Sequence, residues 1–475
     1  MPPYKATAMS LKPYPQKALS ALLGAAVLAL AGLVPAYANT DPLADLLDTA
    51  GSAGLGFAVR SEQSPYAGGG TRYDLLPLYL YEGERVFLHG SRAGLKVFKA
   101  DSQRVDFFVE QRFEGFPDDR IPPSLAGMAE RGAGLDAGVS YRYRQPWGTL
   151  GAEVTHDIGG LSRGTELRLS YSYDWRAGAL TLRPSLSVAA RDARLNNYYY
   201  GVRPGEATAT RPAYEPGSGI NTTLGLFGTY ELTEGWRLLA GVSRTLLDSK
   251  VQDSPIVRKS GQTAVFLGAA YDFGTHKRSW AEESTPLYVK AMYGKSSDDG
   301  CHLIKIATLR CTSTAKVNST RIVGVQVGKP FIERFKDLPL DFVGYLGVLH
   351  HDDRGLAPNG VEFNAIMKAY YYGFPWSDRV NTRLGLGIGV SMAQRLPYME
   401  SSSQAARGRQ TSRLLNYLDP SVDFSLGDLI GKRALKNTYL GFGVSHRSGI
   451  FGSSRLLGNV NGGSNYIYTY LETVL

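Results

Sequence analysis

The chain has 475 residues, a formal net charge of +9, 11% aromatic residues, 29 tyrosines, 55 glycines and two cysteines. Its mean hydropathy is −0.18, and no apolar run after Ala38 is long enough for a transmembrane helix. These values exclude a helical membrane protein. Basic residues do not alternate with aromatic ones in the way that indicates nucleic-acid binding, so we expect no nucleic-acid partner.

The N-terminus has the three parts of a secretory signal peptide. Three lysines come first, Lys5, Lys12 and Lys17. An uncharged apolar run follows over 18–34, and Ala-Tyr-Ala at 36–38 is a small-residue cleavage site. We predict that residues 1–38 are a signal peptide. The alternative is a membrane anchor, but the run is at the short limit for a span.

Downstream segments alternate apolar and polar residues with a period of two, which is typical of β-strands. In 166–173, Leu and Tyr alternate with Glu, Arg and Ser, and 180–188 repeats the pattern. An apolar face toward lipid and a polar face toward a wet lumen is the pattern of a transmembrane β-barrel. A secreted soluble β-protein, with the two faces exchanged, is the alternative.

The first half of the chain contains twelve predicted strands. They lie near 53–60, 72–81, 104–113, 133–143, 148–157, 163–174, 178–190, 220–231, 235–246 and 262–273, with two more in 85–98. Short and long connections alternate only if 85–98 breaks into two strands at Gly90–Gly94. Bacterial outer-membrane barrels have short periplasmic turns, longer outer loops and an even number of strands. We therefore expect a twelve-stranded antiparallel barrel.

The second half contains eight predicted strands, again with long outer connections and short turns. They lie near 286–295, 318–329, 339–349, 361–372, 380–392, 416–427, 436–446 and 465–475. Between the halves, 274–284 is polar and does not alternate. We predict an all-β protein with two tandem transmembrane barrels, and the alternative is one barrel of about twenty strands. The predicted divisions are 1–38 (signal peptide), 50–274 (first barrel), 275–285 (linker) and 286–475 (second barrel).

The first half contains five short motifs in a fixed order: Gly54–Phe57, Tyr73–Tyr79, Tyr199–Val202, Asp253–Val257 and Ala270–Phe273. By these motifs it resembles the MipA/OmpV family of outer-membrane proteins over about residues 50–274. The resemblance implies an outer-membrane scaffold or surface-interaction protein, with murein-hydrolysing and murein-synthesising proteins as partners. It implies no catalytic residues. A porin-like channel is a further alternative for this half.

A polar pair ends an apolar strand face near the C-terminus. In Tyr439–Ser448, His446 and Ser448 share a face with Leu440, Phe442 and Val444. The pair makes sense at a membrane surface if that face contacts lipid. An eight-stranded barrel with His-x-Ser at this place resembles PagL-type lipid A 3-O-deacylases, which use a Ser nucleophile, a His base and a Glu. His446 and Ser448 match the base and the nucleophile.

Two other positions of the deacylase pattern differ. The Asn that follows the family's Ser is Gly449 here, and the Glu that orients the His is Asn465. An Asn can orient a His, although it does not stabilise an imidazolium as a carboxylate does. We expect a Ser448–His446–Asn465 cluster, with backbone N–H groups after Ser448 binding the oxyanion. The alternative is an inactive descendant with polar residues at the interface.

Three further features lie in the second half. Cys301 and Cys311 are predicted to form a disulfide that restrains an outer loop. Residues 350–353, His-His-Asp-Asp, are expected to be a solvated loop and not a metal site, and no cofactor is expected. The longest outer loop contains three arginines that suit the phosphates of lipopolysaccharide, and the alternative is a solvated basic loop with no ligand. They are Arg407, Arg409 and Arg413.

Overall fold

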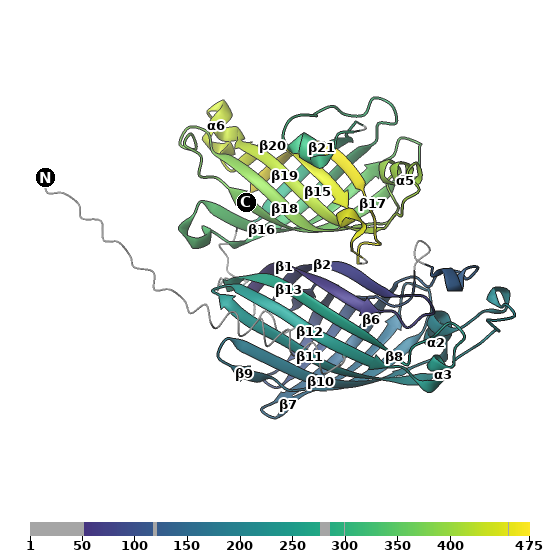
Figure 1. Cartoon of the computed structure of the whole chain (residues 1–475). Coiled ribbons are helices and arrows are strands. Elements are labelled where there is room, and N and C mark those ends of the chain that lie inside the picture. The colour runs from purple at the N-terminus through teal and green to yellow at the C-terminus, as the bar shows by residue number, and fades with distance from the viewer. Residues whose placement is uncertain (1–51, 117–120, 276–285, 299, 455) are drawn as a thin grey trace, which may run out of the picture.

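The computed structural model describes residues 52–116, 121–275, 286–298, 300–454 and 456–475. These residues form two closed antiparallel β-barrels, seen in Figure 1 with the first barrel in purple to teal and the second in green to yellow. None of the helices in these ranges is long and apolar enough to cross a membrane. The predicted signal peptide lies outside the described residues, as does the predicted linker from 276 onward.

The first barrel closes through pairing of β13 with β1 and of β10 with β11. Its strands are β1 (Ser52–Gln63), β2 (Thr71–Glu82), β3 (Val86–His89), β4 (Arg92–Lys99), β5 (Gln103–Arg112), β6 (Gly134–Gln145), β7 (Gly148–Asp157), β8 (Thr165–Ser172), β9 (Trp175–Ala177), β10 (Leu180–Arg191), β11 (Gly219–Thr233), β12 (Trp236–Leu246) and β13 (Gly261–Thr275). Strands β8 and β9 pair with successive parts of β10 and act as one interrupted strand. The barrel therefore has twelve strands, as predicted.

The break predicted within 85–98 is present. Strand β3 ends at His89 and β4 begins at Arg92, and Gly90 adopts a φ of 62°. That left-handed conformation is accessible to glycine at little cost, so the chain can reverse within two residues. His89 and Arg92 are register partners across the turn.

The second barrel closes through pairing of β21 with β14. Its strands are β14 (Tyr288–Ser296), β15 (Arg321–Ile332), β16 (Leu340–Asp352), β17 (Gly360–Tyr371), β18 (Thr382–Ala393), β19 (Leu414–Ser425), β20 (Thr438–Ser448) and β21 (Gly463–Val474). All eight predicted strands are present. Two separately closed sheets rule out the single barrel of about twenty strands.

Short helices lie in the connections. They are α2 (Ala193–Tyr200), α3 (Ser249–Gln252), α4 (Leu303–Ala307), α5 (Tyr398–Ala405) and α6 (Leu426–Ile430), with 3-10 turns η2 (Pro123–Leu125), η3 (Pro204–Glu206), η4 (Phe335–Asp337), η5 (Arg433–Leu435) and η6 (Ile450–Gly452). In Figure 1, α2, α3 and α5 lie at one end of the barrels, opposite the end near the C-terminus. We call the former the outer end, because bacterial barrels place their longer loops there.

Loop length assigns this orientation less cleanly than the sequence predicted. The outer connection 353–359 is as short as the opposite turn 333–339, and 372–381 is longer than both. Strand β16 runs on to Asp352 and shortens the loop that follows it. The other outer connections of the second barrel, 297–320, 394–413 and 449–462, are long as expected.

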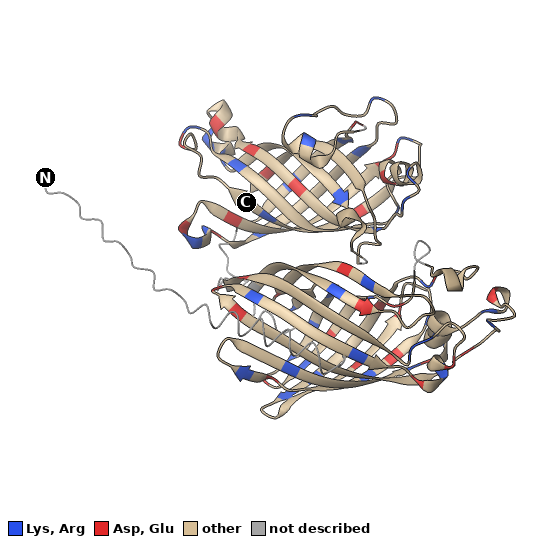
Figure 2. Ribbon diagram, viewed as in Figure 1, with Lys and Arg blue, Asp and Glu red and all other residues tan. Residues whose placement is uncertain are grey.

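The two faces of the strands have the predicted polarity. In β20, Tyr439, Gly441, Gly443 and Arg447 are buried in the lumen, whereas Phe442 faces outward with 52% of its surface exposed. Figure 2 shows charged residues along the strands of both barrels as well as in the loops. On the strands of the second barrel the buried charges pair with one another across the lumen, for example Lys368 with Asp419. The exterior is therefore the lipid-facing surface.

The expectation that residues 350–353 form a solvated loop is wrong. They lie at the end of β16 and just beyond it, and successive side chains point to opposite faces. His351 is 3% exposed and its Nε2 lies 2.8 Å from Glu362 Oε2, while Asp353 is 1% exposed. Among the described residues, no group of three or more His, Cys, Asp or Glu side chains is placed to hold a metal ion.

Candidate functional sites on the two barrels

A polar cluster lies on the outward face of the second barrel at its outer end. His446 on β20 and Asn465 on β21 are register partners, and His446 Nδ1 lies 2.7 Å from Asn465 Oδ1. Since an amide oxygen only accepts, this contact requires the proton on Nδ1. Nε2 is then the basic nitrogen, which is the tautomer that a general base needs.

Ser448 lies two residues further along the same face of β20 and is partly exposed. Ser448 and His446 are both described, and no hydrogen bond joins their side chains. Nucleophile–base hydrogen bonds are often formed only when substrate is bound, so this geometry does not exclude the pair. The roles assigned to Ser448, His446 and Asn465 stay predictions.

The backbone expected to bind the oxyanion is already engaged. The N–H of Gly449 donates to the carbonyl of Gly462 at 3.2 Å. The expectation that this N–H is accessible is therefore wrong. The outer ends of β20 and β21 continue pairing one residue beyond the last ladder partners, Ser448 and Gly463.

A fourth member of the cluster was not predicted from the sequence. Asn416 on β19 is the register partner of Ser448, and their side chains share the outward face. Directly opposite residues in antiparallel strands have Cβ atoms about 4.5–5.5 Å apart. Tyr79 on β2 of the first barrel donates its hydroxyl proton to Asn416 Oδ1. This bond fixes the amide so that its NH₂ group is the part left to donate.

The sequence did contain a signal for Asn416. Along β19, Asn416 has the same parity as Leu418 and Val422, so it interrupts an apolar outward stripe just as His446 does in β20. The link to Tyr79 had no such signal, because it depends on how the two barrels pack. The N–H of Leu75 also donates to the carbonyl of Ser453 at 2.7 Å across this contact.

A loop folds against the outer face of β20 beside the polar cluster. We call residues 300–320 the flap; it contains α4 and the predicted disulfide between Cys301 and Cys311, which is present. Cys301 and Ile306 pack on Val444, which is only 6% exposed. Asn465 Nδ2 donates to the carbonyl of Cys301 at 3.4 Å. The flap is thus joined to the partner of His446.

The predicted lipopolysaccharide-binding arginines lie together in the loop 394–413. Arg407, Arg409 and Arg413 are all exposed, and Arg409 Nη1 donates to the carbonyl of Asn461 at 3.0 Å. The loop is anchored from below by Glu400 of α5, a fully buried carboxylate 3.1 Å from Arg447 Nε. The loop that contains the arginines is therefore anchored to the barrel. The role of the arginines in binding stays a prediction.

The lumen of the second barrel is packed with compensated charges. Glu472 Oε1 lies 2.7 Å from Arg383 Nη2, and Glu472 Oε2 lies 3.4 Å from Lys290 Nζ. Lys368 Nζ lies 2.7 Å from Asp419 Oδ2. Glycines at 385, 387 and 389 make room, because a Cβ on Gly385 would lie 2.6 Å from Lys368 Cε. This packing does not favour conduction.

The outer end of the first barrel is covered by loops that form a small hydrophobic core. We call residues 64–70, 121–133, 192–218 and 247–260 the outer cap. Its buried side chains include Tyr66, Leu125, Leu195, Tyr199, Tyr200, Val251 and Ile256. The Ser254 hydroxyl donates to the carbonyl of Tyr200 at 2.6 Å, and the Tyr66 hydroxyl donates to that of Tyr199 at 3.1 Å.

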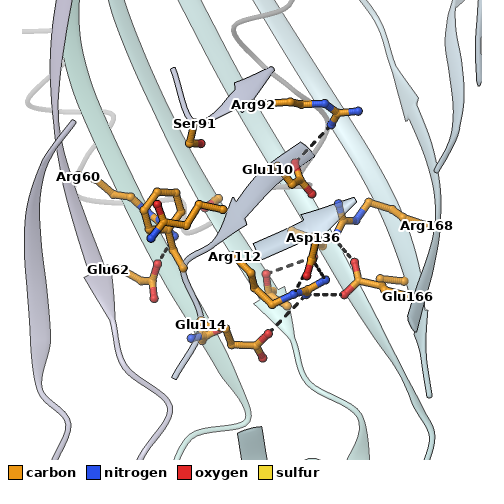
Figure 3. A pocket seen from close by; sticks show the side chains of 18 of the residues that line it. Arg60, Glu62, Ser91, Arg92, Glu110, Arg112, Glu114, Asp136, Glu166 and Arg168 are labelled. Carbon is orange, nitrogen blue, oxygen red and sulfur yellow. Dashed lines mark hydrogen bonds and ion pairs between the residues drawn. The ribbon is translucent and has the colours of Figure 1, made fainter. Parts of the chain in front are cut away.

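Beneath the cap, the first barrel keeps a lumen cavity of about 310 Å³, shown in Figure 3. One wall is charged and comes from β1, β4, β5, β6, β8 and β10. Figure 3 labels its residues Arg60, Glu62, Arg92, Glu110, Arg112, Glu114, Asp136, Glu166 and Arg168. The opposite wall, from β11 to β13, is neutral and contributes small side chains such as Thr223, Ser243 and Ala264. The capped end does not favour an open channel.

Comparison with known proteins finds a family that the first barrel is similar to. Residues 55–273 match the family described as MltA-interacting protein MipA. Over these residues the larger barrel is similar to the MipA family. The match coincides with β1 to β13 and confirms that part of the predicted resemblance. The resemblance of the second barrel to lipid A deacylases stays a prediction.

Several relatives are outer-membrane proteins of Gram-negative bacteria. Outer membrane protein Omp26La of Vibrio anguillarum is 33% identical over 150 residues, which is 32% of this chain and 58% of that protein. Putative outer membrane protein YiaT of Escherichia coli K12 is 24% identical over 47% of this chain and 92% of its own length. The MltA-interacting protein of Escherichia coli K12 is 25% identical over 47% and 91%. With two β-barrels, this chain is an outer-membrane protein.

Among solved structures, the ferric enterobactin receptor PfeA of Pseudomonas aeruginosa aligns with 90% of this chain at 10% identity and a TM-score of 0.25. A score this low carries no information about the function of either barrel.

Proposed function

We propose that the protein is an envelope scaffold whose larger barrel binds a murein-hydrolysing enzyme of the MltA type. The similarity of residues 55–273 to the MipA family carries this proposal. The MltA-interacting protein of Escherichia coli K12 aligns with this chain over 91% of its own length at 25% identity. The compact outer cap supports it as well, since a rigid barrel with a covered outer mouth suits holding a partner better than conducting solutes.

A murein enzyme meets the barrel at the periplasmic end, and charged turns protrude there. Glu84 and Arg85 follow β2, Asp101 follows β4, Arg176 lies in β9 and Glu234 precedes β12; all five are exposed. Trp147, Trp175 and Trp236 at the same end are half exposed and lie where a barrel has its interfacial aromatic belt. The charged side chains of these turns are exposed, so a partner at this end can contact them.

The test is co-purification of the full-length protein with the MltA-type hydrolase of the same bacterium from cross-linked envelopes. We expect Arg85→Glu together with Arg176→Glu to lower the recovered hydrolase several-fold. The matched control is Arg194→Glu, an exposed arginine on α2 at the outer end. No hydrolase with the wild type, or equal loss in the control, overturns the proposal.

A second candidate function is hydrolysis of an acyl ester in the outer leaflet by the polar cluster of the second barrel. The His446–Asn465 hydrogen bond on a lipid-facing strand favours it. At this depth a nucleophile meets the acyl esters of lipid A without extracting the lipid. The pairing of Ser448 with Asn416 adds a side-chain donor where Gly449 provides none.

The proposed reaction has two steps. Ser448 Oγ attacks the ester carbonyl while His446 Nε2 takes its proton, and the Asn416 NH₂ group donates to the developing oxyanion. The sugar alkoxide leaves with the proton from His446, and the acyl chain stays on Ser448. Water, deprotonated by His446, then releases the fatty acid. Removing one oxyanion donor typically lowers the rate by roughly 100–1,000-fold.

The test is mass spectrometry of lipid A from cells that express the wild type, Ser448→Ala or Asn416→Ala. We expect one 3-hydroxyacyl chain to be lost with the wild type only. Asn416→Asp is the control for packing, because it keeps the acceptor for Tyr79 but removes the donor, and we expect it to be inactive too. Intact lipid A with folded wild-type protein overturns this candidate and leaves the scaffold proposal untouched.

A further inference from the structure

The cavity in the first barrel combines three features that a filled structural lumen lacks. Its volume of about 310 Å³ is at the lower end of the roughly 300–1,000 Å³ typical of small-molecule sites. Its charged wall and its neutral wall face each other across the lumen. Part of the charged wall also contacts solvent, since the side chain of Arg60 is 25% exposed and that of Glu110 is 15% exposed.

The charges that line the cavity already compensate one another. Arg112 lies 2.5 Å from Asp136 Oδ2 and 3.1 Å from Glu166 Oε2, and Arg191 lies 2.8 Å from Glu114 Oε2. Five arginines and five carboxylates line the space. A charged ligand would have to break such pairs, whereas a neutral ligand with many hydroxyls can donate to the carboxylates and accept from the guanidiniums at once.

Asp136 has a buried acceptor atom on this wall that receives no hydrogen bond from the described residues. Asp136 is 1% exposed, and both of its hydrogen bonds from the Arg112 guanidinium go to Oδ2. Asp136 Oδ1 is buried without a hydrogen-bond partner among the described residues. A buried carboxylate oxygen is costly to leave unpaired, and a ligand hydroxyl is a donor that would satisfy it.

The rest of the lining has the chemistry of a carbohydrate site. Asn221, Thr223, Ser243, Thr245 and Gln262 supply hydroxyl and amide groups that both donate and accept. Phe266 supplies apolar ring surface, on which the C–H face of a sugar ring can pack. The small side chains of β11 to β13 create the space that the larger residues of the opposite wall leave open.

We propose that the cavity of the first barrel binds a neutral sugar of mono- or disaccharide size, with Asp136 Oδ1 accepting a ligand hydroxyl. The site is independent of the scaffold role and of the polar cluster on the second barrel. It lies on the lumen side of the strands, beneath the outer cap.

The test is calorimetric titration of the purified full-length protein with four probes: glucose, N-acetylglucosamine, maltose and N,N′-diacetylchitobiose. Citrate and glycylglycine serve as an anion and a zwitterion. We expect at least one sugar to bind with a dissociation constant in the micromolar to millimolar range. We expect neither charged probe to bind. Absence of sugar binding by folded protein, or binding of citrate or glycylglycine alone, overturns the proposal.

A matched pair of variants locates the site. Ala264→Phe fills the cavity from the neutral wall without removing a hydrogen bond, and we expect it to weaken sugar binding at least 10-fold. Val265→Phe adds a similar bulk to the lipid-facing side of the same strand, where Val265 is 37% exposed, and we expect no change. Asp136→Asn, which keeps the shape of the side chain, is expected to weaken binding several-fold. Unchanged binding in Ala264→Phe contradicts the assignment.

Discussion

The two barrels share a strand architecture but place their polar groups differently. The lumen of the smaller barrel is filled by charged side chains, including Lys290, Lys368 and Glu472, which are completely buried. The larger barrel has twelve strands, so its lumen side chains do not meet across the centre and a cavity remains. Strand number thus decides whether lumen charges act only as packing or also line a space that can receive a ligand.

The outer ends of the two barrels also differ in where their polar side chains lie. In the larger barrel, arginines of the loops point inward and join the cap: Arg131 is fully buried and pairs with Glu206, and Arg211 is 7% exposed. In the smaller barrel, the loop arginines Arg407 and Arg409 are exposed, and a flap lies on the barrel exterior. The first barrel closes its outer mouth, and the second presents groups to the membrane surface.

The largest expected effect comes from matched Glu→Gln changes in the two lumens. Glu472 is completely buried between Lys290, Arg383 and Tyr345, so Glu472→Gln leaves buried cations uncompensated. We expect a loss of about 3–5 kcal/mol in the free energy of unfolding. Glu110 lines the cavity 3.5 Å from Arg92, and Glu110→Gln should cost at most about 1 kcal/mol.

Urea unfolding in detergent, followed by tryptophan fluorescence and gel heat-modifiability, measures both changes. Equal losses in the two variants would mean that the larger lumen is as tightly packed as the smaller one, and the contrast between the barrels would fail.

The second-largest expected effect concerns the flap. A disulfide holds the flap, whereas the cap is held by a hydrophobic core. Replacing Cys301 and Cys311 with serine releases a loop closed over ten positions. We expect a local loss of about 2–3 kcal/mol in the stability of the flap. Limited proteolysis of folded protein should cleave within 300–320 in the variant and not in the oxidised wild type.

The cap serves as the internal control for this experiment. Its core of loop side chains contains no cysteine, so the change of Cys301 and Cys311 to serine should leave residues 192–218 resistant to protease. Cleavage of the cap at the same rate as the flap would show general unfolding and not release of the flap.

How far the sequence predicted this molecule depends on whether the interactions are local. Period-two alternation and glycine turns located the long strands and the break at Gly90, because both are read within a few residues, but they missed the short strand β9. His351 and Asp353 were misassigned as a solvated loop, because their burial depends on Glu362 and on the backbone N–H of Tyr398 from other segments.

In the polar cluster, too, the sequence predicted the local interactions and missed those between distant segments. The parity of His446 and Asn465 followed from the sequence, since their strands are adjacent along the chain. The pairing of Ser448 with Asn416 needed the register of β19 with β20, and the bond from Tyr79 needed the contact between the barrels. The engagement of the Gly449 N–H by Gly462 depended on the length of the β20–β21 pairing, which loop composition does not specify.

The third expected effect is the pH response of the cap. Burial alone would raise the pKa of Glu206. Hydrogen bonds from Arg131 and from the backbone N–H groups of Arg203 and Ala129 outweigh it and lower the pKa from 4.5 to about 2. A group whose pKa is lower in the folded state stabilises it above its unfolded pKa, and this contribution is lost as pH falls.

The cap should therefore loosen between about pH 4.5 and pH 2. Hydrogen exchange of residues 121–133 and 192–218 checks this. In Glu206→Gln, exchange should be faster at neutral pH and should change less across this range. Wild-type exchange that stays flat from pH 5 to pH 2 would contradict the role of Glu206.

The smallest expected effect concerns the exposed arginines of the second barrel. Changing Arg407, Arg409 and Arg413 to Gln removes three exposed guanidinium groups, the group that suits bidentate contact with phosphates. At about 0.5 kcal/mol for each exposed contact, the affinity for lipopolysaccharide should fall on the order of 10-fold, and less at high salt.

The matched control changes Lys432, Arg433 and Lys436, which lie in the turn 426–437 at the opposite end, to Gln. Binding of the purified protein to lipopolysaccharide micelles at low and high salt measures both. Because the control removes the same charge from the periplasmic end, an equal loss in both variants would assign the effect to net charge and not to the outer loop.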